Sequence, residues 1–460
     1  MQLNAVVLAA GQGKRMKSKL FKVLHPVCGK PMVQHVIDML EAVQAARKVV
    51  VVGHGADSVK ETVGSRVEYA LQDQQLGTAH ALMQAAPLLE DEEGLTLVVY
   101  GDTPLLSADT IELMLDAHRK QAAAVTLLTA IMPNPAGYGR IIRGEAGGVE
   151  SIVEDKDCTP EQRAITEINT GTYCFDNRKL FAALRQVTND NAQGEYYLTD
   201  VIGIMRKAGE RAAGFVMSDH TESTGVNDRV ALAEVEAIMR RRINHKHMMA
   251  GVTLIDPEST YIEADVRIGS DTVIEPGSVL RGQTVIGEDC LIGPQTEITD
   301  SIIGAGSTIR RAVLLEAETG MKVNVGPFAY LRPGTKLGDG VKVGDFVEIK
   351  NAVIGVGSKI PHLSYVGDAT VGSHVNIGCG VITANYDGIH KHRTEIEDDA
   401  FIGSNSNLIA PVRVGKGAYV VAGTTITHNV NEGDVAIARV KQTNKPGYAD
   451  VLRARIRGTT

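Results

Sequence analysis

The chain has 460 residues, a formal net charge of −8 and 22% charged residues. At roughly 100–200 residues per domain, this length predicts two or three domains. The acidic balance argues against nucleic acid as a partner, because phosphate backbones are bound by basic surfaces. The first residues lack a basic leader, and no apolar run approaches the roughly 18–20 residues that cross a bilayer, so we expect a cytoplasmic protein that binds no membrane.

Apolar strands alternate with helical stretches through residues 1–228, which predicts an α/β domain with a mostly parallel, Rossmann-like sheet. The expected strands are 5–9, 48–53, 95–100 and 125–130, and the expected helices are 32–43, 78–89 and 108–121. Residues 229–250 then predict one long linker helix, free of Gly and Pro, with a basic last turn before Gly251. A second domain over 251–437 and a basic tail over 438–460 follow.

The first expected strand runs directly into a glycine-rich turn, residues 8–16. Turns at this place in α/β sheets hold phosphates through backbone N–H groups, because glycine lets the main chain come close. The spacing matches neither the dinucleotide motif nor the P-loop. Arg15 and Lys22 add cations nearby, so a phosphate site is predicted, although a surface turn with solvated cations explains this segment alone equally well.

An aliphatic residue returns every sixth position across much of residues 251–437, as in Ile268, Ile274, Leu280 and Ile286. A small or β-branched residue follows each aliphatic after four positions. A helix requires returns at three and four, and a half-buried strand requires a return at two. The period therefore predicts a β-solenoid with three short strands per coil, against a β-sandwich, whose strands lie about 8–12 residues apart.

The six-residue period breaks over the polar stretch 383–393, which carries two His, a Lys and an Arg. We expect this stretch to leave the coil as a loop on a binding face. The five cysteines are odd in number and lack any C-x-x-C pair, so they are expected to be buried free thiols. They are Cys28, Cys158, Cys174, Cys290 and Cys379.

Ordered motifs in the N-terminal half resemble those of the sugar-1-phosphate nucleotidyltransferases: LAAGQGKRM at 8–16, QDQQLGTAH at 72–80, YGDTPL at 100–105, GYGR at 137–140, NTG at 169–171, EYYLTD at 195–200 and GVN at 225–227. The resemblance implies that Gln72 and Thr78 read uracil, that Arg15 and Lys22 are catalytic cations, and that Asp102 and Asn227 hold Mg²⁺. The implied binding residues for UTP and the nucleotide sugar are Leu8, Ala9, Ala10, Gly11, Lys22, Gln72, Gly77, Thr78, Tyr100, Asp102, Gly139, Glu154, Asn169 and Asn227. For Asp102 alone, a turn aspartate after a strand is the alternative.

The six-residue period is similar to that of the hexapeptide-repeat acyltransferases, which implies a left-handed parallel β-helix. Across essentially the whole chain, the order of segments resembles a family of bifunctional uridylyltransferase–acetyltransferases. This implies that His362 is the base that takes a proton from an amine attacking a thioester. The implied sugar-phosphate ligands are Arg332, Lys350, Tyr365 and Asn376, and the implied acetyl-CoA contacts are Cys379, Asn385, Tyr386, Ser404, Ala422 and Arg439.

Some of these positions have ordinary alternatives. Arg332 and Lys350 taken singly could be solvated cations on a solenoid face. Cys379 stands where the family commonly has alanine, and a thiol is close in size to a methyl group, so acetyl-CoA binding should survive. The basic tail could close over coenzyme A phosphates, or it could be a solvated terminus.

The resemblance implies that acetyl-CoA acetylates glucosamine 1-phosphate at the C-terminal site. UTP then uridylylates N-acetylglucosamine 1-phosphate at the N-terminal site with Mg²⁺, giving UDP-N-acetylglucosamine and pyrophosphate for cell-wall synthesis. A homotrimer is expected. One rival is a nucleotidyltransferase whose non-catalytic β-helix serves oligomerisation, and His362 and the loop over 383–393 count against it. Another rival is a trimerisation scaffold with a degenerate head.

Overall fold

The computed structural model describes residues 2–145, 147–191 and 193–458. Its contacts divide the chain into two compact units, Met1–Arg242 and Ile243–Thr460. The division falls inside α9 (Arg229–Met249), the helix expected between the two domains. Within the described ranges, no helix is both long and apolar enough to cross a membrane.

The first unit is built on a sheet with the strand order β11-β7-β10-β6-β1-β4-β5, and β8 and β9 extend it from β10. β1 pairs in parallel with β4 and β6, whereas β10 runs antiparallel to β6 and β7. The sequence prediction of a mostly parallel sheet is therefore confirmed. The strands are β1 (Leu3–Leu8), β4 (Arg47–Val52), β5 (Glu68–Leu71), β6 (Leu95–Tyr100), β7 (Val125–Ile131), β8 (Arg140–Arg143), β9 (Val149–Val153), β10 (Glu167–Asp176) and β11 (Ala212–Val216), with a small hairpin of β2 (Pro26–Val27) and β3 (Lys30–Pro31).

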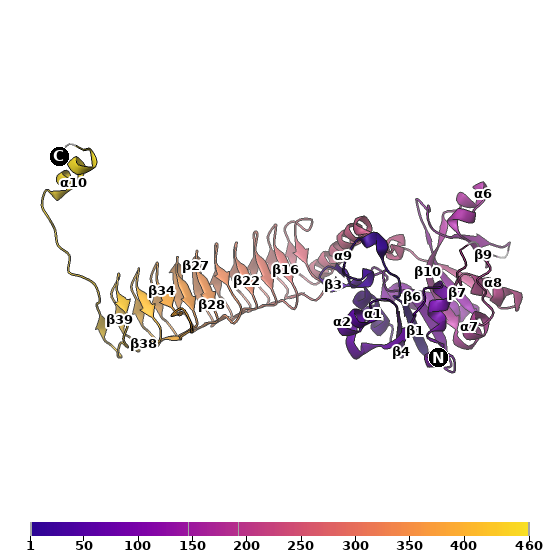
Figure 1. Ribbon diagram of the computed structural model, residues 1–460, viewed down its shortest axis with the longest axis horizontal. Coiled ribbons are helices and arrows are strands. Elements are labelled where there is room, and N and C mark those ends of the chain that lie inside the picture. The colour runs from indigo at the N-terminus through magenta and orange to yellow at the C-terminus, as the bar shows by residue number, and fades with distance from the viewer. Residues whose placement is uncertain (1, 146, 192, 459–460) are drawn as a thin grey trace. The chain divides into compact units, whose positions relative to one another are not determined.

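Helices cover both faces of this sheet (Figure 1). The central strand β1 shows why: Val6 and Leu8 belong to one apolar core, and Ala5 and Val7 to the other, because side chains alternate along a strand. The helices are α1 (Met32–Ala42), α2 (Ala56–Val63), α3 (Thr78–Met83), α4 (Ala86–Leu89), α5 (Ala108–Gln121), α6 (Pro160–Arg163), α7 (Asn177–Leu184) and α8 (Asp200–Lys207), with 3-10 turns η1 (Lys14–Met16), η2 (Lys22–Leu24), η3 (Gly64–Arg66), η4 (Asp155–Asp157) and η5 (His220–Ser223).

The helix expected over 78–89 is two helices, α3 and α4, and this part of the prediction was wrong. Pro87 lies in the first turn of α4. A continuous helix would require the nitrogen of Pro87 to donate to the carbonyl of Met83, but proline has no N–H, and its ring would clash there. Proline is tolerated in a first turn, so the helix restarts.

The carboxyl ends of β1 and β6 bring the glycine-rich turn beside Asp102. Leu8 pairs with Tyr100 in register, so the residues that follow each strand leave the sheet at the same edge. Open α/β sheets bind ligands outside the carboxyl ends of their strands. The topology thus places the first candidate site.

The second unit is a parallel β-helix whose short strands form three sheets, as the six-residue period predicts. The first sheet holds β12 (Thr253–Leu254), β15 (Val273–Ile274), β18 (Leu291–Ile292), β21 (Thr308–Ile309), β24 (Asn324–Val325), β27 (Lys342–Asp345), β30 (Lys359–His362), β33 (Asn376–Ile377), β36 (Phe401–Ile402), β39 (Tyr419–Val420) and β41 (Val435–Ala436). The second holds β13 (Tyr261–Ile262), β16 (Val279–Arg281), β19 (Glu297–Thr299), β22 (Val313–Leu315), β25 (Tyr330–Leu331), β28 (Glu348–Lys350), β31 (Tyr365–Gly367), β34 (Ile382–Ala384), β37 (Asn407–Ile409) and β40 (Thr425–Ile426). The third holds β14 (Arg267–Ile268), β17 (Val285–Ile286), β20 (Ile302–Ile303), β23 (Glu318–Thr319), β26 (Lys336–Leu337), β29 (Val353–Ile354), β32 (Ala369–Val371), β35 (Thr394–Ile396) and β38 (Val412–Val414).

The periodic aliphatics fill the interior of the β-helix, and the small residues after them are buried beside them. Ile274, Ile292 and Leu314 have no exposed surface. Buried hydroxyls are satisfied by the next coil: the Thr272 hydroxyl accepts from the backbone N–H of Cys290 at 3.0 Å, and the Ser358 hydroxyl accepts from Val375 at 3.0 Å. Each buried polar group must find such a partner, which explains why Ser and Thr are tolerated in this core.

The loop in the β-helix spans 385–393, because β34 ends at Ala384 and β35 begins at Thr394. The sequence placed its start two residues earlier. Thr383 is fully buried, and its hydroxyl accepts from the backbone N–H of Gly367 at 2.8 Å. It therefore continues the hydroxyl pattern of the core. Ile377 pairs with Ile402, so the extra residues bulge out without breaking the ladder.

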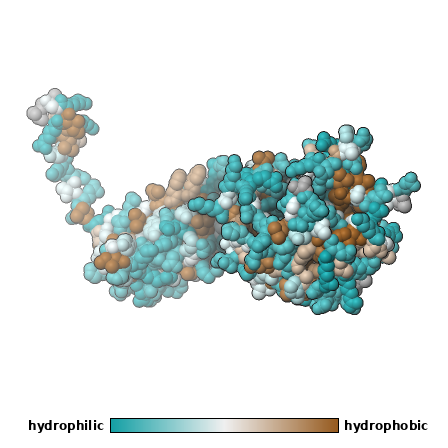
Figure 2. All heavy atoms as spheres, turned by 45° about the vertical axis from the view of Figure 1, so that its right-hand side comes forward, coloured by the Kyte–Doolittle hydropathy of each residue, from teal (hydrophilic) through white to brown (hydrophobic). Residues whose placement is uncertain are grey.

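The basic tail leaves the β-helix after β41 and ends in a helix that the sequence did not predict, α10 (Tyr448–Ile456). Figure 2 shows brown, apolar side chains among hydrophilic ones on this helix. Val451, Leu452 and Ile456 are all exposed. Four of the five cysteines are buried free thiols as expected, and Cys379 is half-buried.

The β-helix core generates a stability prediction from two neighbouring residues of β22. Leu314 is fully buried, whereas Val313 is 37% exposed. We expect Leu314→Ala to lower the free energy of unfolding by about 2–5 kcal/mol, because a cavity remains in a closely packed core. Val313→Ala is the matched control and should cost less than about 1 kcal/mol. Denaturant titration of both variants, followed by circular dichroism, checks this, and equal losses would contradict it.

Candidate functional sites

A cleft of about 660 Å³ opens at the carboxyl edge of the sheet in the first unit. Its lining includes the glycine-rich turn, the segment after β5, the end of β6 and the segment before α9. Of the predicted nucleotide-binding residues, the lining includes Leu8, Ala9, Ala10, Gly11, Lys22, Gln72, Gly77, Thr78, Tyr100, Asp102 and Asn227. Residues separated by more than two hundred positions therefore meet at one place.

Three polar side chains converge inside this cleft. The Lys22 ammonium forms an ion pair with the Asp102 carboxylate and donates to the Asn227 side-chain oxygen at 2.7 Å. The backbone also joins the two oxygen-bearing segments, because the N–H of Val226 donates to the carbonyl of Asp102 at 3.0 Å. A carboxylate and an amide oxygen thus face one cation.

Gln72, Gly77 and Thr78 form the wall of the cleft that the resemblance implies for uracil binding. The backbone conformation of Gly77 constrains this wall. Gly77 has φ +112, and a side chain there would lie 2.5 Å from the carbonyl oxygen of Tyr196. Only glycine fits that approach. Gln72 is buried and donates to the carbonyl of Gly77 at 3.1 Å. The Thr78 hydroxyl accepts from the N–H of Leu198 at 3.0 Å, which ties this wall to the EYYLTD motif.

Gly139, Glu154 and Asn169 form a group beside the cleft, whose lining includes their neighbours Tyr138 and Thr170. The N–H of Asn169 donates to the carbonyl of Gly139 at 2.8 Å. Burial raises the pKa of Glu154, and the charges of Asp157, Asp155 and Asp200 add to this rise. The EYYLTD motif thus contributes an acidic neighbour to the implied sugar-binding group.

Arg15 is exposed on η1 and is not part of the lining of the cleft. A smaller cavity of about 510 Å³ borders the same turn and is lined by residues that include Lys14, Lys17, Lys19 and His54. The glycine-rich turn is therefore also bordered by three lysines. Lys22 alone among the predicted catalytic cations lines the cleft in this structure.

The second candidate site is a column of residues at one edge of the β-helix. Asp345 pairs with His362 in register, and Lys359 pairs with Asn376 in the next coil. Ile377, Ile402 and Val420 continue the register. The equivalent positions in successive coils are therefore Asp345, His362, Cys379, Ser404 and Ala422. Coils lie about 4.8 Å apart, so this column offers a long, straight track for an extended ligand.

His362 is oriented by an acidic partner that the sequence analysis did not identify. Its Nδ1 lies 2.7 Å from the Asp345 Oδ1, and both side chains are accessible to solvent. The hydrogen bond with His362 holds the pKa of Asp345 below its usual value. A carboxylate at Nδ1 fixes that nitrogen as the N–H, which leaves Nε2 free to accept a proton.

A group of cations lies on the neighbouring sheet. Arg332 and Lys350 occupy equivalent positions in successive coils, since Leu331 pairs with Ile349. Arg332 donates to Glu348 at 2.8 Å. The ammonium of Lys350 lies so close to Lys391 of the loop that it lowers the pKa of Lys391. Two ammonium groups that repel each other make a favourable place for an anion.

Asp368 holds the loop against these cations. It accepts hydrogen bonds from Asn351, at 2.6 Å, and from Asn385, and it lies 3.9 Å from the Lys350 ammonium. Burial alone would raise the pKa of Asp368, but these hydrogen bonds and the lysine charges keep it below its usual value. Asn385 is thereby buried as a structural anchor, whereas the neighbouring Tyr386 is exposed.

The remaining predicted acetyl-site residues lie on three different segments. Tyr365 begins β31, two positions before Gly367, which pairs with Lys350, and Asn376 begins β33. Arg439 is exposed in the tail beyond β41. The chain therefore brings His362, Cys379, Ser404 and Ala422 into one column, and it leaves Arg439 outside that column.

Comparison with known proteins connects both sites to families. Residues 4–229 match the model for nucleotidyl transferases, and residues 265–300 and 393–428 match the bacterial transferase hexapeptide model of six repeats. A protein named Bifunctional protein GlmU from Brevibacillus brevis is 60% identical over 98% of this chain and 98% of its own length. Proteins of the same name are 60% identical in a Geobacillus species, over 97% of this chain and 98% of theirs, and 55% identical in Listeria monocytogenes, over 97% and 98%.

The chain belongs to the GlmU family. GlmU proteins combine a uridylyltransferase with an acetyltransferase, so the chain is an enzyme with both activities. The hexapeptide repeats make its C-terminal half a left-handed β-helix and fit an acetyltransferase, which excludes the rival with a β-helix used only for oligomerisation. The resemblance inferred from the sequence is confirmed.

Sequence reasoning missed Asp345, Asp368 and Lys391. Asp345 and His362 are 17 positions apart, about one coil, and a register drawn from the six-residue period could have paired them. No comparable signal exists for Lys391, because its approach to Lys350 depends on how the loop folds back.

The loop also generates a prediction about acid pH. Asp387 accepts from the N–H of His390 at 2.7 Å, from the His392 ring at 2.7 Å and from the N–H of Ile389 at 2.8 Å. These bonds lower the pKa of Asp387 to about 2. Its stabilisation of the loop should therefore be complete above about pH 4, where an unfolded aspartate is ionised, and should be lost as the pH falls toward about 2.

Carbon-13 NMR of labelled aspartate carboxyls measures this titration, with Asp387→Asn to assign the signal. A midpoint well below that of an unfolded aspartate is expected. A midpoint at or above the ordinary value would show that the loop does not hold the ionised carboxylate.

Proposed function

We propose that the column on the β-helix acetylates glucosamine 1-phosphate and that the cleft of the first unit then uridylylates the product. The proposal is supported by the convergence of several implied residues at each of the two sites. Lys22, Asp102 and Asn227 meet in the cleft, and His362 stands in line with Cys379, Ser404 and Ala422. The substrates are acetyl-CoA, UTP and the two sugar phosphates.

In the acetyl step, the amine nitrogen of glucosamine 1-phosphate attacks the thioester carbonyl carbon. The carbon–sulfur bond breaks, coenzyme A leaves as its thiolate, and Nε2 of His362 takes the proton from the amine. Arg332, Lys350 and Lys391 hold the sugar phosphate through charge. Tyr365 and Asn376 contact the sugar, and Cys379, Tyr386, Ser404, Ala422 and Arg439 contact acetyl-CoA. Asn385 belongs to the same site as the buried anchor that holds the loop beside them.

In the uridylyl step, a phosphate oxygen of N-acetylglucosamine 1-phosphate attacks the α-phosphorus of UTP. The bond to the β-phosphate breaks and pyrophosphate leaves. The nucleophile is already anionic, so no general base is required, and positioning with charge neutralisation carries the rate. Lys22 supplies one fixed charge at the cleft, and Arg15 adds another when phosphates cover the glycine-rich turn.

Asp102 and Asn227 would hold Mg²⁺ in this step. The fit rests on their oxygens, which already converge on the Lys22 cation. No cluster of three His, Cys, Asp or Glu side chains suited to a metal exists among the described residues, so phosphates and water must complete the shell. Such partial ligation suits Mg²⁺, which gives up its waters reluctantly, and the bound ion neutralises phosphate charge.

We further propose a cytoplasmic homotrimer assembled through the β-helix. UTP and acetyl-CoA are cytoplasmic metabolites, which supports the location. Phe328 and Phe346 support a trimer: they are 52% and 58% exposed and stack with ring centroids 5.4 Å apart. Leu363 occupies the same position in the next coil and is also exposed. This apolar column lies beside His362, so a second copy that covers it would border the acetyl site.

Two variants should separate the activities. Asp102→Ala should abolish pyrophosphate release and leave acetylation near normal. His362→Ala should lower acetylation by about 10²–10⁴-fold, the usual contribution of a general base, and leave uridylyl transfer intact. Both rates are followed in one preparation, as free thiol and as pyrophosphate. If either variant keeps its assigned activity, or loses both activities while folded, the assignment of that residue is wrong.

Sedimentation equilibrium of the full chain tests the assembly. We expect a mass of three times the 49.1 kDa chain. Phe346→Asp should weaken association, because a charge on the apolar column must be desolvated when another copy covers it. A wild-type protein that sediments as a monomer at micromolar concentration would refute the trimer.

A further inference from the structure

Helix α9 contacts three of the segments that line the uridylyl cleft: the glycine-rich turn, the loop after β6 and the segment that precedes α9. Its first turn reaches the glycine-rich segment, where Arg229 donates to the carbonyl of Met16 at 3.3 Å. An apolar cluster then joins α9 to the loops that carry Asp102 and Asn227, with residues Met16, Val27, Met32, Leu105, Val226, Val235, Leu232, Ile238 and Met239. The helix is therefore packed directly behind the site.

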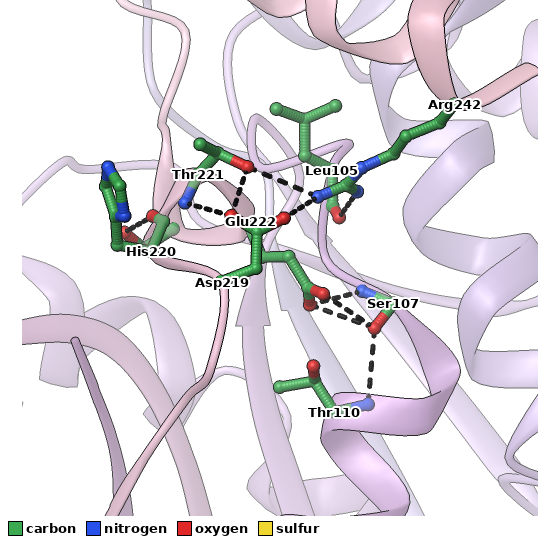
Figure 3. A network of polar contacts seen from close by, with 9 residues as sticks. Leu105, Ser107, Thr110, Asp219, His220, Thr221, Glu222 and Arg242 are labelled. Atoms are coloured by element: carbon green, nitrogen blue, oxygen red, sulfur yellow. Dashed lines mark hydrogen bonds and ion pairs between the residues drawn. The ribbon is translucent and has the colours of Figure 1, made fainter. Parts of the chain in front are cut away.

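One side chain of this helix joins the loop after β6 to the segment around η5 (Figure 3). Arg242 donates Nη1 to the carbonyl of Leu105 at 2.6 Å and Nη2 to the Asp219 carboxylate at 2.8 Å. A longer contact of 3.3 Å runs from Nη2 to the Thr221 hydroxyl. Leu105 is three residues beyond Asp102, and Asp219 lies in the segment that leads to Asn227. The planar, forked guanidinium fixes the spacing between its acceptors.

The segment that Arg242 contacts, around η5, is also bonded to the start of α5. Glu222 is buried, and its carboxylate accepts from the N–H of Ser107 at 3.0 Å and from the Ser107 hydroxyl. The same hydroxyl accepts from the N–H of Thr110 and so caps α5. A carboxylate at a helix N-terminus is favoured by the helix dipole. The η5 turn is thus held between α5 and α9 (Figure 3).

Arg242 forms an ion pair with Asp219 that does not depend on a group titrating near neutral pH. Burial alone would raise the pKa of Asp219, but hydrogen bonds from Thr221 and Arg242 keep it below its usual value. An ordinary aspartate has a pKa of about 3.9, so a carboxylate with a lowered pKa is ionised at neutral pH. The guanidinium is always protonated, so the contact does not switch with pH.

We propose that Arg242 is a positioning residue for the uridylyl reaction: it holds the Asp102 and Asn227 loops at the separation that one shared divalent cation requires. This rests on the proposed assignment of Asp102 and Asn227 to the metal. Asp102 and Asn227 meet through a single backbone hydrogen bond from Val226 and through Lys22. A guanidinium fork behind them restrains the same two loops from the opposite side.

The test is the affinity of the full-length protein for Mn²⁺, measured by electron paramagnetic resonance with saturating UDP-N-acetylglucosamine. Arg242→Ala should weaken Mn²⁺ binding by about 10-fold or more, since residues that support metal ligands typically change affinity about 10–100-fold. Arg241→Ala is the matched control, because Arg241 is the exposed arginine next to it on the same helix. Acetylation by the same preparation should be unchanged.

Arg242→Lys keeps the charge but not the fork, and it should weaken Mn²⁺ binding by a smaller factor than Arg242→Ala. If circular dichroism shows that Arg242→Ala does not fold, the Mn²⁺ affinity of Arg242→Lys is compared with that of Arg241→Ala instead. Mn²⁺ affinity equal to that of Arg241→Ala would overturn the inference, even if pyrophosphate release fell. Asp102→Ala in the same titration distinguishes failure of the proposed metal site from failure of the role of Arg242. If Asp102→Ala binds Mn²⁺ like the wild type, the proposed metal site is wrong. If Asp102→Ala loses Mn²⁺ while Arg242→Ala does not, only the role of Arg242 is wrong.

Discussion

Backbone pairing between successive coils is the constraint on which the second half of this protein depends. Because each coil repeats the position of the last, a residue is placed beside its equivalent about one coil later, and chemistry can be built as a column. Asp345 and His362 are such a pair. The inward aliphatics keep the register, and the buried hydroxyls satisfy the backbone where the coil turns, as Ser358 does for Val375. The side chains of this column therefore project from strands whose register the core sets.

The first half uses a different arrangement to reach the same end. Its parallel strands deliver the glycine-rich turn and Asp102 to one edge of a sheet, and the chain returns much later to add Asn227. Two loops that meet this way have no repeat to fix their spacing. Packing behind them must do so, and α9 provides it through an apolar cluster and the guanidinium of Arg242.

The basic groups at the two sites play different parts. Lys22 is already paired with Asp102 and Asn227, so any ligand that enters the cleft must compete with or join this contact. Lys350 and Lys391 instead repel each other and are only partly neutralised by Asp368. An anion relieves that repulsion. The charges of Lys350 and Lys391 thus favour an anionic ligand such as a phosphate, independently of hydrogen bonds.

The β-helix and the α/β sheet could be predicted from the amino-acid sequence, because the six-residue period and the alternation of strands with helices are local properties of the chain. Sequence reasoning missed the break between α3 and α4, although Pro87 was visible, because the helical pattern continued across it. The coil register could have paired Asp345 with His362, but the hydrogen bond that orients the imidazole was seen in the folded chain. The approach of Lys391 to Lys350 and the contact of Arg242 with Leu105 also came from the folded chain. These last two depend on loop path and helix packing, which no local sequence pattern encodes.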